Sequence, residues 1–153
     1  MALNLTAPVH EFIARHHVMT LATQGSEGPW AAALFYVPDG DGLVFLSAPG
    51  SRHGRDIALQ PRCAATIQGQ EQDWSAIRGV QLEGVAATLE GAERERARQL
   101  YAGRFSFVRP GNAPDAILRA LARVQWYRLA IARLFFIDNS RGLGQRQQFD
   151  ATP

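Results

Sequence analysis

The chain has 153 residues, 46% hydrophobic and 20% charged, a composition typical of one folded domain and unlike that of disordered or collagen-like chains. No apolar run approaches the roughly 20 residues that span a bilayer, and residues 1–5 lack the basic start of a secretory signal. We therefore expect a cytoplasmic protein of one domain, residues 1–153, with no membrane partner. The single cysteine, Cys63, excludes an intramolecular disulfide and a structural zinc site built on thiolates.

The distribution of charge bears on a second class of partner. The net charge is +2, and all 16 basic residues are arginine. A nucleic-acid-binding protein gathers its cations in one stripe, whereas these arginines are spread from Arg15 to Arg146 among 14 acidic residues. We therefore expect no nucleic-acid partner. The planar fork of arginine remains well suited to phosphate or carboxylate.

The first third of the chain alternates apolar runs with glycine-rich turns. Thr6 and Pro8 mark the start of a helix over residues 7–15. Three β-rich segments follow, at residues 18–23, 30–37 and 43–47. The connections between them are shorter than the dozen or so residues of a parallel crossover. They favour antiparallel hairpins and argue against a Rossmann domain.

The rest of the chain adds strands and short helices. Ser51 stands at the N-cap of a helix over residues 52–60, which ends before Pro61. We predict further strands at residues 63–69, 78–90, 124–129 and 133–137, and helices at residues 92–105 and 114–122. A closed or nearly closed antiparallel barrel of about seven strands hides most sheet edges in a domain of this size.

Residues 43–61 carry the most specific chemical pattern. A strand ends at Ser47, a Pro-Gly turn follows, and Ser51, Arg52 and His53 then open a helix. Their hydroxyl, guanidinium and imidazole groups, together with the free N–H groups of the helix start, would converge on one anion. This pattern predicts a phosphate site. In the alternative interpretation, Ser51 only caps the helix and Arg52 is solvated.

This segment resembles a known family. Phe45-Leu46-Ser47, then Gly50-Ser51-Arg52-His53, and Pro61-Arg62 after the helix are similar to the FMN-phosphate segment of the pyridoxamine 5′-phosphate oxidase-like, FMN-binding split-barrel family. The resemblance covers residues 18–86 and implies a mainly β, antiparallel split barrel of about six to seven strands with peripheral helices. It also implies that Leu46, Ser47, Ser51, Arg52 and His53 contact FMN, with His53 in the place usually filled by lysine.

The resemblance implies further contacts with the flavin ring. The strand from Ala31 to Tyr36, with Ala32, Ala33 and Leu34 at its centre, would lie along the ring, because small side chains leave backbone groups free to reach a flat surface. Plain core packing explains the same alanines equally well. Arg78 falls where the family often has an arginine directed toward the cofactor.

Departures from the family pattern bear on the substrate. Ala31 and Tyr36 stand where the vitamin B6 oxidase has an arginine and a lysine, and Ile137 replaces its tryptophan that contacts flavin. We therefore expect a substrate other than pyridoxamine phosphate. Residues 77–81 and 137–139 look closer to small bacterial members of the family.

The resulting functional hypothesis is an FMN-dependent oxidoreductase acting on a small molecule, with no catalytic residue identified. The alternatives are a protein that holds flavin or haem without turnover, and an interaction module with an empty barrel. The family implies a homodimer with shared cofactor sites, to which residues 139–146 and an apolar strand face would contribute. That face is formed by Val80, Leu82, Val85 and Ala87.

Two other sequence patterns give no evidence for a binding site. His10, His16 and His17 have no carboxylate or cysteine at a recognisable ligand spacing, so we expect no metal site. The Gly-x-Gly at residues 142–144 lacks the helix that follows it in a dinucleotide fingerprint.

Overall fold

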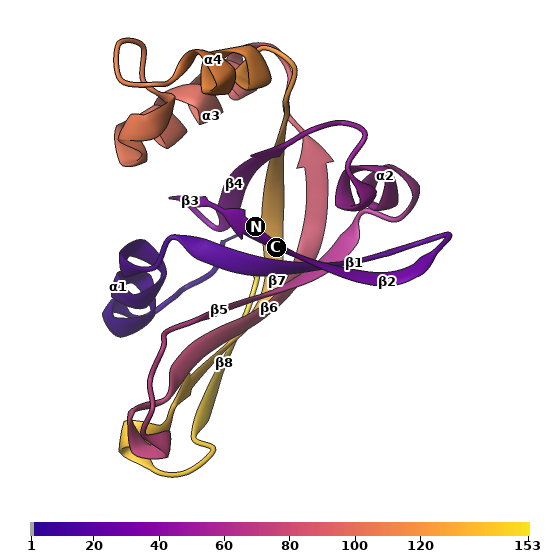
Figure 1. Cartoon of the computed structure of the whole chain (residues 1–153). Helices are drawn as coiled ribbons and strands as arrows, with labels where there is room; N and C mark the ends of the chain where they lie inside the picture. The colour runs from indigo at the N-terminus through magenta and orange to yellow at the C-terminus, as the bar shows by residue number, and fades with distance from the viewer. Residues whose placement is uncertain (1) are drawn as a thin grey trace.

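A computed structural model describes residues 2–153 (Figure 1). Its α-helices are α1 (Ala7–Arg15), α2 (Arg52–Leu59), α3 (Gly91–Arg104) and α4 (Asp115–Leu121). Its strands are β1 (Val18–Gly25), β2 (Gly28–Phe35), β3 (Val37–Asp39), β4 (Gly42–Ser47), β5 (Arg62–Gln68), β6 (Arg78–Thr88), β7 (Gln125–Asp138) and β8 (Arg146–Asp150). Three short 3-10 helices are η1 (Trp74–Ala76), η2 (Ser106–Val108) and η3 (Asn139–Arg141).

All eight strands belong to one antiparallel sheet. Its order is β2-β1-β5-β6-β7-β4-β3, and β8 pairs with β7 beside this path. The sheet curls on itself, α1 and α2 lie against it, and α3 and α4 gather at one end (Figure 1). This confirms the predicted mainly β split barrel with peripheral helices. Among residues 2–153, no helix is long and apolar enough to cross a membrane.

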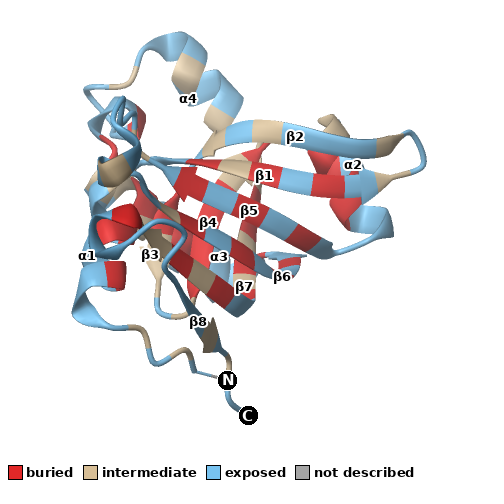
Figure 2. Ribbon diagram, turned by 90° about the horizontal axis from the view of Figure 1, so that it is seen from below, coloured by how far each residue is buried: buried red, intermediate tan, exposed pale blue. Residues whose placement is uncertain are grey.

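The core follows from the alternation of side chains along the strands (Figure 2). On β5, Cys63, Ala65 and Ile67 are buried, and the residues between them are exposed. The main cluster also takes Phe12 and Ile13 from α1. A second, smaller cluster lies under α3 and α4 and is built around Trp126, Tyr101 and Phe105.

The secondary structure predicted for the last thirty residues or so of the chain was wrong in two places. The expected strands 124–129 and 133–137 are one strand, β7, which continues through a register shift opposite Glu83 and Gly84. Only glycine fits at residue 84, because a Cβ there would lie 2.0 Å from the carbonyl oxygen of Ala130. The tail after residue 141 was not predicted as a strand, yet it forms β8, whose Phe149 packs against the main core.

The apolar face predicted on β6 was also wrong, because it joined residues from two sides of the strand. Val80 and Leu82 are buried in the core, whereas Val85 and Ala87 point outward. Val85 is 46% exposed. Only the outward pair is open to a partner.

Candidate functional site

The end of β4 and the start of α2 bring three predicted site residues together. The Ser47 hydroxyl donates to Ser51 Oγ over 3.1 Å, and His53 Nε2 lies 2.5 Å from Ser47 Oγ. The backbone N–H of Gly54 donates to Ser51 Oγ over 3.1 Å, so Ser51 is the N-cap of α2 as predicted. We call Ser47, Ser51 and His53 the serine–histidine cluster.

Arg52 lies beside this cluster and faces the β1–β2 turn. Its Nη2 donates to the carbonyl oxygen of Glu27 over 3.0 Å, and its guanidinium carbon lies 4.5 Å from the ring centroid of Trp30. Its Nε is buried and has no hydrogen-bond partner among residues 2–153. A buried cationic donor without an acceptor is costly, and an anion that came within reach of it would satisfy it. Arg52 is therefore not simply solvated.

Two residues that the sequence analysis missed hold α2 against the sheet. The Thr23 hydroxyl donates to Asp56 Oδ2 over 2.8 Å, and Asp56 is only 3% exposed. A signal was present in the sequence, because Thr23 follows Met19 and Leu21 at inward-facing positions of β1. A hydroxyl at such a position requires a buried partner.

Burial determines the charge of His53. Its side chain is among the few buried polar groups of the chain, at 8% exposure. Burial lowers the pKa of His53 below its ordinary value, and the nearby Asp56 carboxylate opposes this only in part. Without an anion at the site, the imidazole is therefore mainly neutral at pH 7.

Within residues 2–153, β2 is an edge strand of the sheet and pairs only with β1. Ala32, Ala33 and Leu34 pair with Leu21, Thr20 and Met19, so the other backbone edge of β2 is open in the described chain. An open edge of small residues gives a flat ligand access to backbone N–H and C=O groups. Tyr36, by contrast, is fully buried, and its hydroxyl donates to the carbonyl oxygen of Ile13 over 2.6 Å. The Tyr36 side chain therefore cannot contact a flavin ring that lies along β2.

The side chains of the two remaining predicted contacts do not join the serine–histidine cluster. The half-buried Leu46 side chain packs against the second core cluster. Arg78 starts β6 and pairs with Asp138 over 3.3 Å, at the opposite end of β7 from Gln125, the partner of Ser47. A single chain thus does not bring Arg78 to the cluster.

Comparison with known proteins identifies the family of the chain. The family model of pyridoxamine 5′-phosphate oxidase matches residues 5–138. The chain belongs to this family. Within the family it is 33% identical over 144 residues to UPF0306 protein YhbP of Escherichia coli, covering 93% of this chain and 90% of that protein. A UPF0306 protein of Photorhabdus laumondii is 31% identical over 140 residues, covering 90% of each chain. The predicted resemblance to small bacterial members is confirmed.

Solved structures share the fold. A heme binding protein from Mycobacterium smegmatis superposes with a TM-score of 0.72 at 26% identity over 95% of this chain, which spans 60% of that chain. The heme storage protein HutZ from Vibrio cholerae has a TM-score of 0.64 at 21% identity, covering 86% of this chain and 91% of its own. A pyridoxamine 5′-phosphate oxidase-like protein from Listeria innocua has a TM-score of 0.66 at 12% identity, covering 86% of this chain and 96% of its own.

Proposed function

We propose that this protein binds FMN and acts as a flavin-dependent oxidoreductase on a small molecule. The observation that carries the proposal is the serine–histidine cluster at the start of α2, with the unpaired Nε of Arg52 beside it. Two hydroxyls, an imidazole and a guanidinium are the donors that a phosphate dianion needs to replace its hydration shell. The residues present therefore fit the phosphate of FMN.

Each residue has a distinct part in this proposal. Ser47 and Ser51 would donate hydroxyl hydrogen bonds, Arg52 would supply a permanent charge, and His53 would gain a proton as the phosphate binds. The open edge of β2 would orient the ring through backbone groups of Ala32 and Leu34. When bound, FMN supplies hydride transfer at its N5 atom. The protein then contributes position and the exclusion of water, and no catalytic acid is needed.

We further propose that the working form is a homodimer in which each cofactor site uses both chains. One chain offers the phosphate site and the β2 edge, but it holds Arg78 at the opposite end of β7 from the serine–histidine cluster. The tail exposes Leu143, at 77%, and the outward face of β6 exposes Val85. A second copy that buries such residues would gain ~25 cal/mol per Å² and could bring its tail to the flavin.

Titration with FMN and with riboflavin tests the phosphate site. Arg52→Gln removes the charge near Ser51, and we expect it to weaken FMN binding about 10- to 100-fold, the range for hydrogen bonds to charged groups. Riboflavin, which lacks the phosphate, should bind the variant as it binds the parent. Arg119→Gln on α4 is the matched control. Unchanged FMN affinity in folded Arg52→Gln protein would disprove the assignment, and an equal loss for riboflavin would place Arg52 elsewhere on the cofactor.

Haem is the second candidate, favoured by the similarity to the Mycobacterium smegmatis heme binding protein. Its iron would take an axial ligand such as histidine, cysteine, methionine or tyrosine, and the buried His53 is already hydrogen-bonded to Ser47. The visible spectrum of purified protein separates the two cases. A flavin spectrum that stays with the protein after unbound FMN has been removed supports the proposal, whereas a Soret band in the purified protein would indicate haem in place of FMN.

Light scattering with Leu143→Ser tests the shared site. Deleting the tail would also remove Phe149 from the core, so a point substitution is the cleaner change. The proposal expects a dimer whose FMN affinity falls in the variant. A monomer that binds FMN tightly would refute the shared site, and a dimeric variant with full affinity would refute the role of the tail.

A further inference from the structure

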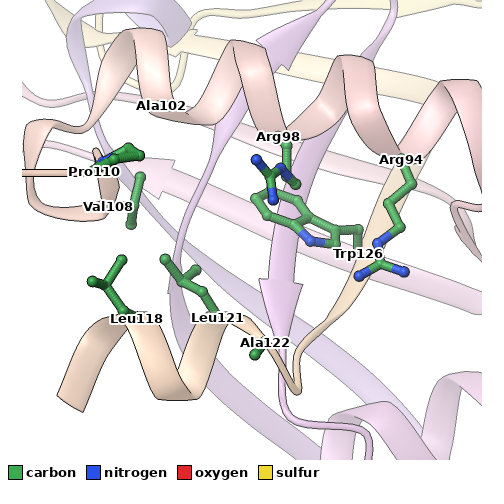
Figure 3. A pocket seen from close by; sticks show the side chains of 9 residues that line it. All are labelled: Arg94, Arg98, Ala102, Val108, Pro110, Leu118, Leu121, Ala122 and Trp126. Carbon is green, nitrogen blue, oxygen red and sulfur yellow. The ribbon is translucent and has the colours of Figure 1, made fainter. Parts of the chain in front are cut away.

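A pocket between α3 and α4 lies apart from the proposed FMN site. Its volume is about 260 Å³, and none of the predicted FMN contacts lines it. Figure 3 shows its lining residues: Arg94, Arg98, Ala102, Val108, Pro110, Leu118, Leu121, Ala122 and Trp126. We call it the α3–α4 pocket.

The body of the α3–α4 pocket is apolar. Val108, Leu118 and Leu121 project into it from η2 and α4 (Figure 3). Its volume is below the roughly 300–1,000 Å³ of sites that take drug-sized ligands, so it suits a smaller molecule than a whole flavin or haem. A ligand that fills it must present an apolar body of about one ring.

One buried donor in the lining lacks an acceptor. Trp126 is 3% exposed, and its Nε1 has no hydrogen-bond partner among residues 2–153. Figure 3 shows the nitrogen on the edge of the indole that faces α4. An unpaired buried N–H costs about 1–3 kcal/mol, and buried tryptophans usually pair this group. A ligand oxygen that reached this N–H from the pocket would satisfy it.

Two cations flank the same indole. Arg94 and Arg98 extend from α3 on either side of Trp126 (Figure 3). Arg98 has an exposed partner, Glu95, at 3.5 Å. Arg94 has no ion pair within the described part of the chain. The polar groups of this pocket are therefore an indole donor and two guanidiniums, and they select a negatively charged acceptor.

We propose that the α3–α4 pocket binds a small carboxylate with an apolar body. The body lies against Val108, Leu118 and Leu121, and the carboxylate accepts from Trp126 and pairs with Arg94 and Arg98. Guanidinium groups match the geometry of a carboxylate, and the apolar walls exclude inorganic anions. This inference is independent of FMN.

Nuclear magnetic resonance of the ¹⁵N-labelled protein tests it, with phenylacetate as the probe. Three indole N–H signals are expected, from Trp30, Trp74 and Trp126, and Trp126→Phe assigns the third. Phenylacetate should shift the Trp126 signal saturably downfield and leave that of the exposed Trp74 in place. Phenylacetamide has the same shape without the charge, and we expect it to bind at least about tenfold more weakly.

Variants of residues that line the α3–α4 pocket separate the contribution of its charges to binding from that of its shape. Arg94→Gln and Arg98→Gln should each weaken phenylacetate binding about tenfold, whereas Arg119→Gln, outside the pocket on α4, should not. Ala102→Leu should block binding by filling the pocket while all charges remain. The proposal is overturned if phenylacetate causes no saturable shift at millimolar concentration, if the amide binds as tightly as the acid, or if both arginine variants bind as the parent does.

Discussion

A single methyl group at Gly25 should displace the helix that carries the proposed phosphate site. Gly25 ends β1, and a Cβ there would lie 1.8 Å from Asp56 Oδ1 and 2.6 Å from its Cγ. The Asp56 side chain is short, buried and hydrogen-bonded to Thr23, so it cannot move aside freely. In Gly25→Ala, either the carboxylate leaves Thr23 or α2 moves away from β1.

The size of the effect follows from these two outcomes. Losing a buried hydrogen bond to a carboxylate costs about 1.5–3 kcal/mol. Forcing an extra methyl group into a packed contact costs about 1–3 kcal/mol. Because either outcome alone relieves the clash, we expect a loss of about 1–3 kcal/mol in the free energy of unfolding. In a chain of this length that lowers Tm by roughly 2–12 °C.

Urea unfolding of Gly25→Ala and of a matched variant measures this loss. Gly50→Ala is the control, because a Cβ at Gly50 meets nothing within 4 Å. A double variant with Asp56→Ala identifies the cause, since Gly25→Ala should cost far less once the carboxylate is gone. The reasoning is refuted if Gly25→Ala is as stable as Gly50→Ala, or if its cost is unchanged in the Asp56→Ala background.

Two further predictions concern ionisation. The pKa of His53 is lowered in the folded protein, so the unfolded chain binds more protons as pH falls through about 6.5. The free energy of unfolding should therefore fall from neutral to mildly acidic pH, and His53→Gln should flatten this profile in urea titrations; an unchanged profile would contradict the assignment. Burial raises the pKa of Cys63 to about 11. Its thiol should react slowly with a disulfide reagent at neutral pH and rapidly in denaturant, and fast reaction of the native protein would contradict its burial.

Local signals explain what could be predicted from the sequence. Glycine-rich turns separate the early strands, so the hairpins and the antiparallel sheet could be predicted from short segments. Ser51 before the helix and Pro61 after it likewise define α2 closely. The serine–histidine cluster was accessible for the same reason, because its three residues lie within seven positions of the chain.

The features that could not be predicted from the sequence depend on contacts between residues distant in the chain. The continuity of β7 depends on a register shift against Gly84, nearly fifty residues earlier in the chain. β8 is polar apart from Phe149, and only its pairing with β7 makes it a strand. The position of Asp56 against Thr23 and Gly25 depends on how α2 docks on β1. Apart from the inward-facing position of Thr23 on β1, none of these contacts leaves a periodic pattern in the sequence.

The presence of histidine at residue 53 follows from the burial of the serine–histidine cluster. The family resemblance implies a lysine at this position. The ordinary pKa of lysine is near 10.4, so a buried ammonium group would either keep its charge at a large desolvation cost or have a strongly lowered pKa. Burying an imidazole costs far less free energy, because it is neutral at pH 7 when burial lowers its pKa. Under the proposed function it would gain a proton when the phosphate of FMN binds, so the affinity for FMN should fall as pH rises through the titration of the complex. The stability of the free protein should change with pH in the opposite direction. One residue would thus be a neutral imidazole in the empty site and a charged one in the occupied site, and His53→Gln should remove both dependences together.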